Sequence, residues 1–271
     1  MDEKAPYQYF EDVNWGLLRL WGRRSGLRVL DVGCGFATTS ARIEKLGNTV
    51  TGIESSAEAE LVAQARITRF IRADLHHADL GSEQFDAIIF ADVLEHLVWP
   101  VGVLEHYLQW LAPGGSVIVS LPNVGLWSVR FAHLFGQWNY DETGVLDRTH
   151  LRFFTRRTGR WLLEQANLQI VKTTYNPGLV RPLVPLAKRL IARRHAERSE
   201  GPGRAGRQAA ASSPALPGPS LDARDDRQAP DALLNSKPYR LYLKTAYPIE
   251  RAVATLWPGM LAFQMIFEAK R

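Results

Sequence analysis

The feature that most constrains the fold is a regular alternation of strand-like and helix-like segments from Leu27 to about Tyr175. Strands are predicted at residues 28–33, 49–54, 67–73, 85–91, 116–121 and 168–175, with helices between most of them. Such alternation predicts an α/β fold with a doubly wound parallel sheet and helices on both of its faces. The apolar, aromatic-rich stretch Met260–Ala269 is predicted to be a seventh strand beside the sixth.

Basic residues are concentrated in one segment. Residues 178–210 contain eight basic and two acidic residues, a net charge of +6, whereas the whole chain carries +5. The remainder of the chain is therefore slightly acidic, and we expect no specific nucleic-acid surface on the core. Ser199–Asp231 has almost no large apolar residues and is predicted to be disordered. Leu179–Arg194 and Tyr239–Trp257 are amphipathic and are predicted helices, with breaks at Pro182, Pro185 and Pro248.

These boundaries divide the chain into a core of residues 1–177, an insertion of residues 178–258 and a final strand of residues 259–271 that completes the core sheet. Three interpretations of the insertion stay open. Its apolar faces and basic residues could contact an anionic membrane surface. It could instead form a lid or the contact of a homodimer, or be a tolerated surface insertion.

The only cysteine, Cys34, excludes an intrachain disulfide and a cysteine-based zinc site. The first ten residues have no apolar core of a secretory signal, and no apolar run is long enough to span a bilayer. We therefore expect a cytoplasmic protein, and the open question of the insertion includes contact with the periphery of a membrane.

The sharpest motif follows the first predicted strand. The strand brings Asp31 to its carboxyl end, and Gly33 and Gly35 then allow a tight turn that brings the backbone close to a ligand. A dinucleotide-binding loop would have a third glycine where Thr38 stands, and a diphosphate would be repelled by Asp31. An aspartate suits a cationic ligand such as S-adenosylmethionine (AdoMet), which carries an ammonium and a sulfonium. Cys34, between the two glycines, is included in this predicted cofactor site.

Two further carboxylates follow the next two strands. Glu54 stands about 20 residues beyond the glycine loop, where a carboxylate can accept hydrogen bonds from both ribose hydroxyls. Asp74 follows the third strand and can accept from the adenine amino group, with Leu75 against the ring. The alternative for Asp74 is a surface residue that caps a turn.

Several of these blocks together resemble a known family. VLDVGCGFA, GIE, ADL, FDAIIFADVLEHL and LAPGGSVIVSLPN occur in this order within residues 27–175 and resemble the class I AdoMet-dependent methyltransferases. The resemblance implies AdoMet contacts at Asp31, Gly33, Gly35, Glu54 and Asp74. It also implies a Rossmann-like sheet of seven strands in three α/β/α layers, mostly parallel with the last strand antiparallel, and S-adenosylhomocysteine as product.

Two motifs are similar to subgroups of this family. Asp92–Leu97 (DVLEHL) is similar to the ubiquinone-pathway O-methyltransferases and to small-molecule members, whereas Ser120–Trp127 (SLPNVGLW) resembles methyltransferase-like proteins of methionine biosynthesis. The first similarity predicts a small-molecule acceptor, with O-methylation of an isoprenoid, phenolic, glycolipid or sugar-like hydroxyl. The second keeps open an AdoMet-binding accessory protein without activity. The sequence does not distinguish O- from N-methylation.

A hydroxyl acceptor must lose a proton, which calls for a base or a metal. His96 follows the fourth strand and is the leading base, with Glu95 and His150 as further catalytic candidates. Asp92, Glu95, His96 and His150 also offer ligands suited to a divalent ion such as Mg²⁺. We predict a metal-free polar cleft and assign Asp92 to the cofactor site. Trp127–Tyr140 either lines an acceptor pocket with aromatic side chains or forms a helix that covers the sheet edge.

Overall fold

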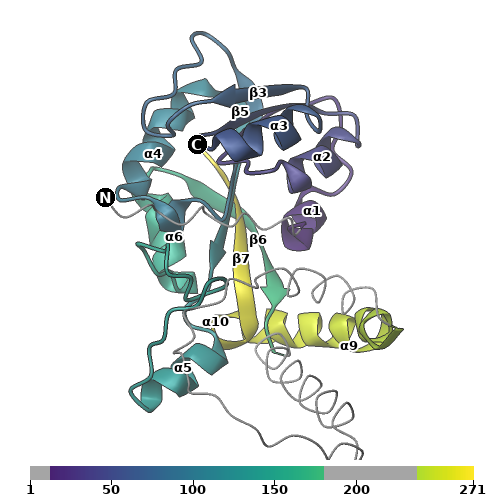
Figure 1. Ribbon diagram of the computed structural model, residues 1–271, viewed down its shortest axis with the longest axis vertical. Coiled ribbons are helices and arrows are strands. Elements are labelled where there is room, and N and C mark those ends of the chain that lie inside the picture. The colour runs from purple at the N-terminus through teal and green to yellow at the C-terminus, as the bar shows by residue number, and fades with distance from the viewer. Residues whose placement is uncertain (1–12, 180–236) are drawn as a thin grey trace, which may run out of the picture. The chain divides into compact units, whose positions relative to one another are not determined.

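A computed structural model describes residues 13–179 and 237–271 of the chain (Figure 1). The chain divides into two compact units, one of residues 1–179 and 253–271 and the other of residues 180–252. Only residues 237–252 of the second unit are described. The predicted disorder of Ser199–Asp231 and nearly all of the predicted helix over 179–194, with its breaks at Pro182 and Pro185, lie outside the described residues.

The first unit contains a seven-stranded sheet of order β3-β2-β1-β4-β5-β7-β6. Strands β1 to β5 are parallel, and β7 runs antiparallel to both of its neighbours, β5 and β6. This arrangement confirms the predicted sheet and the antiparallel last strand. The strands are β1 (Arg28–Val32), β2 (Thr49–Glu54), β3 (Arg69–Arg72), β4 (Phe85–Ala91), β5 (Leu111–Pro122), β6 (Gln169–Pro177) and β7 (Ala262–Lys270).

Helices cover both faces of the sheet, which confirms the three-layer architecture (Figure 1). Alternate residues along each strand point to opposite faces, so Leu30 of β1 packs under α4 and α6 whereas Val29 packs under α1, α2 and α3. The helices on the first face are α4 (Pro100–Tyr107) and α6 (Arg156–Gln165), and those on the second are α1 (Trp15–Trp21), α2 (Thr38–Glu44) and α3 (Ala57–Gln64).

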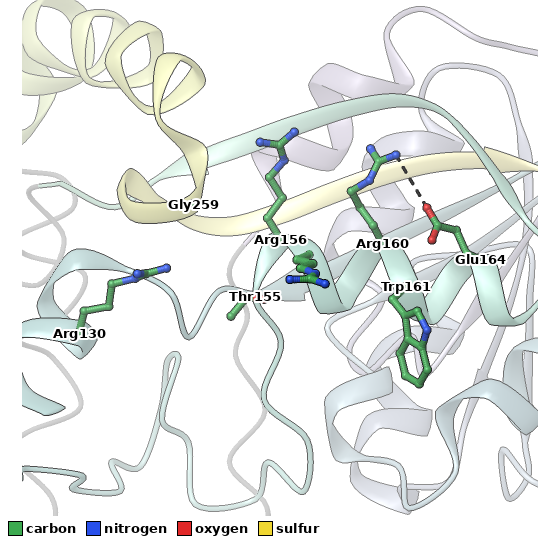
Figure 2. Close-up of a pocket in the computed structure, with 8 residues that line it drawn as sticks. Arg130, Thr155, Arg156, Arg160, Trp161, Glu164 and Gly259 are labelled. Carbon is green, nitrogen blue, oxygen red and sulfur yellow. Dashed lines mark ion pairs between the residues drawn. The ribbon is translucent and has the colours of Figure 1, made fainter.

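Several short helices connect these elements. Two 3₁₀ turns, η1 (Leu94–His96) and η2 (Leu108–Trp110), follow β4 and α4, and α5 (Trp127–Leu134) follows β5. Helix α10 (Pro258–Leu261) directly precedes β7. A cleft lined largely by arginines lies beside α6 (Figure 2).

Helix α9 (Lys237–Leu256) corresponds to the amphipathic helix predicted over Tyr239–Trp257. The predicted break at Pro248 is wrong, because α9 continues through this residue. A proline removes one backbone hydrogen bond of a helix, and here the neighbouring turns retain theirs on both sides. Among residues 13–179 and 237–271, no helix combines the length and the apolar character needed to cross a bilayer.

Candidate active site

The loop after β1 is held tightly between its two neighbouring strands. The backbone N–H groups of Gly33 and Cys34 both donate to the carbonyl of Ile53 in β2, at 2.8 and 3.1 Å. Gly33 has φ +72°, and a Cβ there would lie 2.6 Å from Cγ2 of Val93, which follows β4. This position therefore requires glycine for both its backbone conformation and its close packing.

Asp31 lies beneath this loop with an unsatisfied oxygen. Its side chain is 4% exposed, and Oδ2 accepts a hydrogen bond from the Ser40 hydroxyl. Oδ1 is buried without a hydrogen-bond partner in the described part of the chain. Burial raises the pKa of the Asp31 carboxyl to about 6, the Ser40 hydrogen bond opposes this shift, and the charge of Glu54 adds to it. A buried carboxylate oxygen without a donor fits a ligand that brings an N–H or O–H group.

Glu54 is oriented by backbone N–H groups on both sides of the same edge. Its Oε2 accepts from Gly35 at 3.2 Å, and its Oε1 accepts from Ser55 at 2.7 Å and Ser56 at 3.1 Å. The carboxylate is thereby fixed next to the glycine loop. The Ser55 hydroxyl also donates to Oε1, at 3.1 Å, so the carboxylate is held in one orientation at the edge where a ligand hydroxyl would meet it.

The remaining candidates for the cofactor site lie in different environments. Asp74 is largely exposed, and its Oδ1 accepts from the backbone of His76 at 2.8 Å and lies 3.1 Å from Nδ1 of that residue. These hydrogen bonds lower the pKa of Asp74, chiefly through the backbone contact, so one oxygen caps a turn. Leu75 packs partly buried against the core. Burial raises the pKa of the Cys34 thiol, which keeps it protonated and unreactive.

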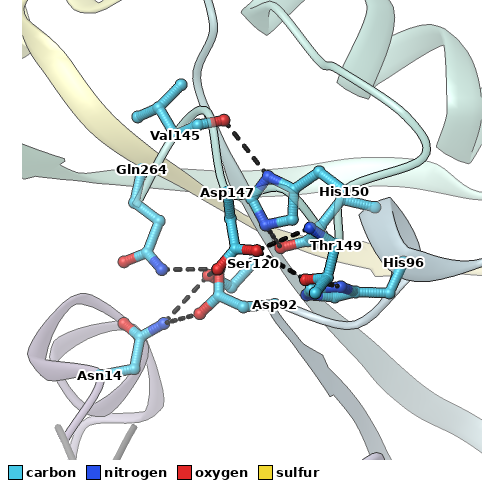
Figure 3. A network of polar contacts seen from close by, with 10 residues as sticks. Asn14, Asp92, His96, Ser120, Val145, Asp147, Thr149, His150 and Gln264 are labelled. Carbon is cyan, nitrogen blue, oxygen red and sulfur yellow. Dashed lines mark hydrogen bonds and ion pairs between the residues drawn. The ribbon is translucent and has the colours of Figure 1, made fainter. Parts of the chain in front are cut away.

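Asp92 joins four elements of the fold. It has φ +58°, and its Oδ1 accepts from Gln264 of β7 at 2.6 Å and from Ser120 of β5 at 3.0 Å (Figure 3). Its Oδ2 accepts from Asn14, just before α1, at 3.3 Å. Burial raises the pKa of this carboxyl, and the three hydrogen bonds oppose the shift. Asp92 therefore connects β4 to α1, β5 and β7.

Glu95, His96 and His150 come together although His150 is far away in the sequence. One ligand atom of each lies within 4.8 Å of the others, and the two imidazole rings are 4.7 Å apart. Nε2 of His150 is 4.0 Å from Oε1 of Glu95, whose side chain is 1% exposed and has no hydrogen-bond partner in the described residues. Burial, followed by the charge of Asp92, raises the pKa of Glu95 well above its usual value.

A polar chain orients His96 (Figure 3). The Thr149 hydroxyl donates to Oδ1 of the buried Asp147 at 2.6 Å, because a carboxylate can only accept. Its oxygen lies 3.1 Å from Nδ1 of His96 and is therefore an acceptor for Nδ1–H. This contact places a proton on Nδ1, and His96 also has a hydrogen bond to the backbone of Thr149. Nδ1 of His150 similarly donates to the carbonyl of Val145 at 3.2 Å.

Both histidines are uncharged at neutral pH. Burial, with a smaller contribution from His150, lowers the pKa of His96 to about 4. Burial also lowers the pKa of His150, against the opposing hydrogen bond to Val145. Two neutral imidazoles beside a carboxyl group can accept and pass protons, and the same three residues could hold a divalent ion. Asp92, the fourth predicted ligand, is engaged in its own network.

The aromatic segment after β5 does not form a closed pocket in the described residues. Helix α5 buries none of its side chains, and Phe131, Phe135 and Tyr140 are exposed. The block Ser120–Trp127, which precedes this segment, contains a residue with a structural role. The buried Asn123 side chain donates to the carbonyl of Ala262 at 2.8 Å and accepts from the backbone N–H of Gly125 at 3.0 Å. Asn123 thus joins the end of β5 to the start of β7.

Sequence reasoning missed the residues that support this site. Asp92 is contacted from three separate elements, by Asn14, Ser120 and Gln264. No local sequence pattern predicted these contacts. Asp147 and Thr149 share one short block with His150, and this proximity was a signal for a role beside His96.

Known proteins resemble the chain in sequence and in fold. A family model described as a methyltransferase domain matches residues 1–173. A ubiquinone biosynthesis O-methyltransferase of Aromatoleum aromaticum is 29% identical over 194 residues, which cover 65% of this chain and 81% of the relative. One from Burkholderia vietnamiensis is 28% identical, with 65% and 82% covered.

Solved structures share the fold at low sequence identity. A SAM-dependent methyltransferase of Archaeoglobus fulgidus has a TM-score of 0.54 at 14% identity, with 94% of this chain and 91% of that chain covered. An S-adenosylmethionine-dependent methyltransferase of Mesorhizobium loti has a TM-score of 0.52 at 16% identity, with 95% and 97% covered.

Proposed function

We propose that this chain, which belongs to the methyltransferase domain family, transfers the methyl group of AdoMet to a hydroxyl group of a small molecule. The family and the seven-stranded fold make it an AdoMet-dependent methyltransferase with S-adenosylhomocysteine as product. The choice of a hydroxyl acceptor is the proposal. It is supported by the names of the relatives, which are O-methyltransferases of ubiquinone biosynthesis, and by a neutral histidine at the carboxyl edge of the sheet.

The loop after β1 and the end of β2 are the proposed cofactor site. AdoMet supplies an electrophilic methyl group on its sulfonium. Asp31 offers an unsatisfied buried oxygen to a donor of this cofactor, and Glu54 offers a carboxylate fixed by Gly35, Ser55 and Ser56 to hydroxyl groups. Gly33 has no side chain, which allows the loop to pack closely against Val93. Asp74 and Leu75 are the proposed contacts of the adenine, and Asp92 completes the proposed cofactor site.

His96 is the proposed general base, and its orientation is the observation that carries the proposal. Because Nδ1–H is directed to Thr149, Nε2 is the nitrogen that can accept a proton. The acceptor oxygen bonds to the methyl carbon as the carbon–sulfur bond breaks, and the hydroxyl proton passes to Nε2. The nearby Asp147 stabilises the imidazolium that forms. Glu95 and His150 complete the polar wall beside His96.

The proposed acceptor is an isoprenoid, phenolic, glycolipid or sugar-like hydroxyl compound. The exposed aromatic residues of the segment after β5, Phe131, Phe135 and Tyr140, support an apolar acceptor. A cytoplasmic location, and contact of residues 178–258 with a membrane surface or a second copy, remain proposals, since most of that insertion lies outside the described residues.

The test is methyl transfer from AdoMet with a labelled methyl group to a panel of phenolic and polyprenyl-phenolic acceptors, with the matched amines beside them. The expected result is a labelled ether with a hydroxyl acceptor and a loss of about 10²- to 10⁴-fold in kcat for His96→Ala, the usual contribution of a general base. His77→Ala, an exposed histidine, is the matched control and keeps full turnover. Transfer only to amines would refute O-methylation. AdoMet binding without turnover on any acceptor would favour the accessory protein.

A further inference from the structure

A basic cleft of about 720 Å³ is lined by residues of α5, α6 and α10 (Figure 2). None of the residues predicted to bind AdoMet or to act in proton transfer lines it. Four of its lining residues are arginines, one from α5 and three from the first part of α6. The lining residues are Arg130, Thr155, Arg156, Arg157, Arg160, Trp161, Glu164 and Gly259.

The charges of this cleft are not neutralised by the residues around it. Glu164 is the single carboxylate of the lining, and it lies 3.9 Å from Arg160, so a surplus of three positive charges remains. Arg156 and Arg157 are exposed and have no ion-pair or hydrogen-bond partner within residues 13–179 and 237–271. As far as the described residues go, the cleft is therefore a concave surface with surplus positive charge.

The position of these arginines on α6 is unfavourable for the helix itself. The first turn of α6 contains no acidic residue, and cations there oppose the positive end of the helix dipole. The helix start does not need them, because Thr155 caps it by accepting from the backbone of Thr158 at 3.3 Å. The described contacts thus give Arg156 and Arg157 no stabilising role in the fold. Such a pattern is expected of residues that serve to bind a ligand.

We propose that this cleft binds a ligand that carries a phosphate or diphosphate group. One guanidinium group can donate two hydrogen bonds to two oxygens of the same phosphate. Several guanidinium groups on two helices therefore favour a multivalent anion over a ligand with a single carboxylate. Arg130 is already oriented, because its Nε donates to the carbonyl of Gly125 at 2.7 Å. The volume exceeds that of one phosphate, and the exposed face of Trp161 provides a surface for the remaining part of the ligand.

The experiment measures binding of two probes to the full chain. Inorganic pyrophosphate is titrated calorimetrically, and vesicles of phosphatidylglycerol are compared with vesicles of phosphatidylcholine by co-sedimentation. The variant is Arg156→Ala with Arg157→Ala. The matched control is Arg23→Ala with Arg42→Ala, which removes the same charge from exposed arginines elsewhere on the first unit.

The expected result is binding of wild type and control, a loss of at least tenfold in the cleft variant, and unchanged affinity of that variant for S-adenosylhomocysteine. Its melting temperature should equal or exceed that of wild type, because the removed charges oppose the helix dipole. Binding of pyrophosphate would identify a soluble phosphate ligand, and binding of the phosphatidylglycerol vesicles alone a lipid headgroup. Equal loss in variant and control, or no binding of either probe by wild type, would overturn the proposal.

Discussion

The hydroxyl oxygen of Thr149 lies 3.1 Å from Nδ1 of His96. Thr149 donates its own proton to Asp147 at 2.6 Å, so its oxygen is an acceptor and His96 is held as the tautomer with a proton on Nδ1. A base is effective only when its lone pair faces the proton that it removes. Thr149 and Asp147 are therefore positioning residues for the proposed proton transfer.

Removal of the Thr149 hydroxyl should lower turnover without affecting cofactor binding. Thr149→Val keeps the branched shape and removes the hydrogen bond to His96, so we expect kcat to fall roughly tenfold or more, a fraction of the contribution of a general base. KM and the affinity for AdoMet should change little, and Thr149→Ser should restore most of kcat. Steady-state kinetics of the three proteins check this. A fall in AdoMet affinity equal to the fall in kcat would assign Thr149 to the fold instead.

The affinity for AdoMet should depend on pH through Asp31. Its pKa is raised to about 6, so in the ligand-free protein the carboxyl is largely protonated below this value. A cofactor that binds the ionised form displaces this proton, and affinity should rise with pH up to about 6 and then level off. Calorimetric titration from pH 5 to pH 8 measures the curve, and Asp31→Asn should flatten it. A curve that falls between pH 5 and pH 6 would contradict the assignment.

The same group should destabilise the ligand-free protein as pH rises. A carboxyl whose pKa is higher in the folded than in the unfolded chain favours folding while it is protonated. This contribution is fully present below pH 3.8, the ordinary pKa of an aspartate, and is lost as pH rises through about 6, the pKa in the folded protein. The melting temperatures of wild type and Asp31→Asn, compared over this pH range, isolate the contribution of the Asp31 carboxyl to stability. The difference between the two proteins should shift in favour of the variant as pH rises, and a constant difference would refute the shift.

Asn123 should be important for stability. It is fully buried, and its side chain donates to the Ala262 carbonyl and accepts from the Gly125 N–H group. Asn123→Ala leaves these groups unsatisfied, at about 1–3 kcal/mol each, so we expect a loss of about 2 kcal/mol or more in urea unfolding. Asn139→Ala, at an exposed position of the same unit, should change stability by less than about 0.5 kcal/mol. Equal effects of the two substitutions would contradict the role of Asn123.

The proposed mechanism needs no divalent ion. Burial raises the pKa of Glu95 well above its usual value, which opposes the ionised form that a metal ligand needs. Turnover should therefore be unchanged after dialysis against EDTA. Loss of turnover that Mg²⁺ or Zn²⁺ restores would show instead that Glu95, His96 and His150 form a metal centre.

The central strands were readable from the sequence because most of them contain a short apolar run bounded by turn residues. Phe85–Ala91 and Thr49–Glu54 are strands at their predicted bounds, and the carboxyl edge followed from them. The apolar, aromatic-rich stretch Met260–Ala269 also predicted a last strand beside β6, as the structure shows. The local sequence pattern was thus sufficient to predict the layers of the fold and the carboxyl edge of the sheet, where the candidate residues lie.

Long-range contacts could not be predicted in this way. The hydrogen bonds of Asp92 come from Asn14, Ser120 and Gln264, whose meeting depends on the packing of α1 and on the register of β7 against β5. Gln264 was visible only as a polar interruption of an apolar run. The continuity of α9 through Pro248 is likewise decided by the turns on either side, whereas a rule for single residues predicts a break.

The most direct test of the account is the affinity of S-adenosylhomocysteine for wild type, Asp31→Asn and Asp79→Asn at pH 7.5, measured by calorimetry. Asp79 is an exposed aspartate of the same unit and serves as the matched control. We predict one tight site in wild type and Asp79→Asn, and affinity at least tenfold weaker in Asp31→Asn because a charged acceptor is lost beneath the glycine loop. Equal affinity in all three proteins would place the cofactor elsewhere and contradict the proposed site.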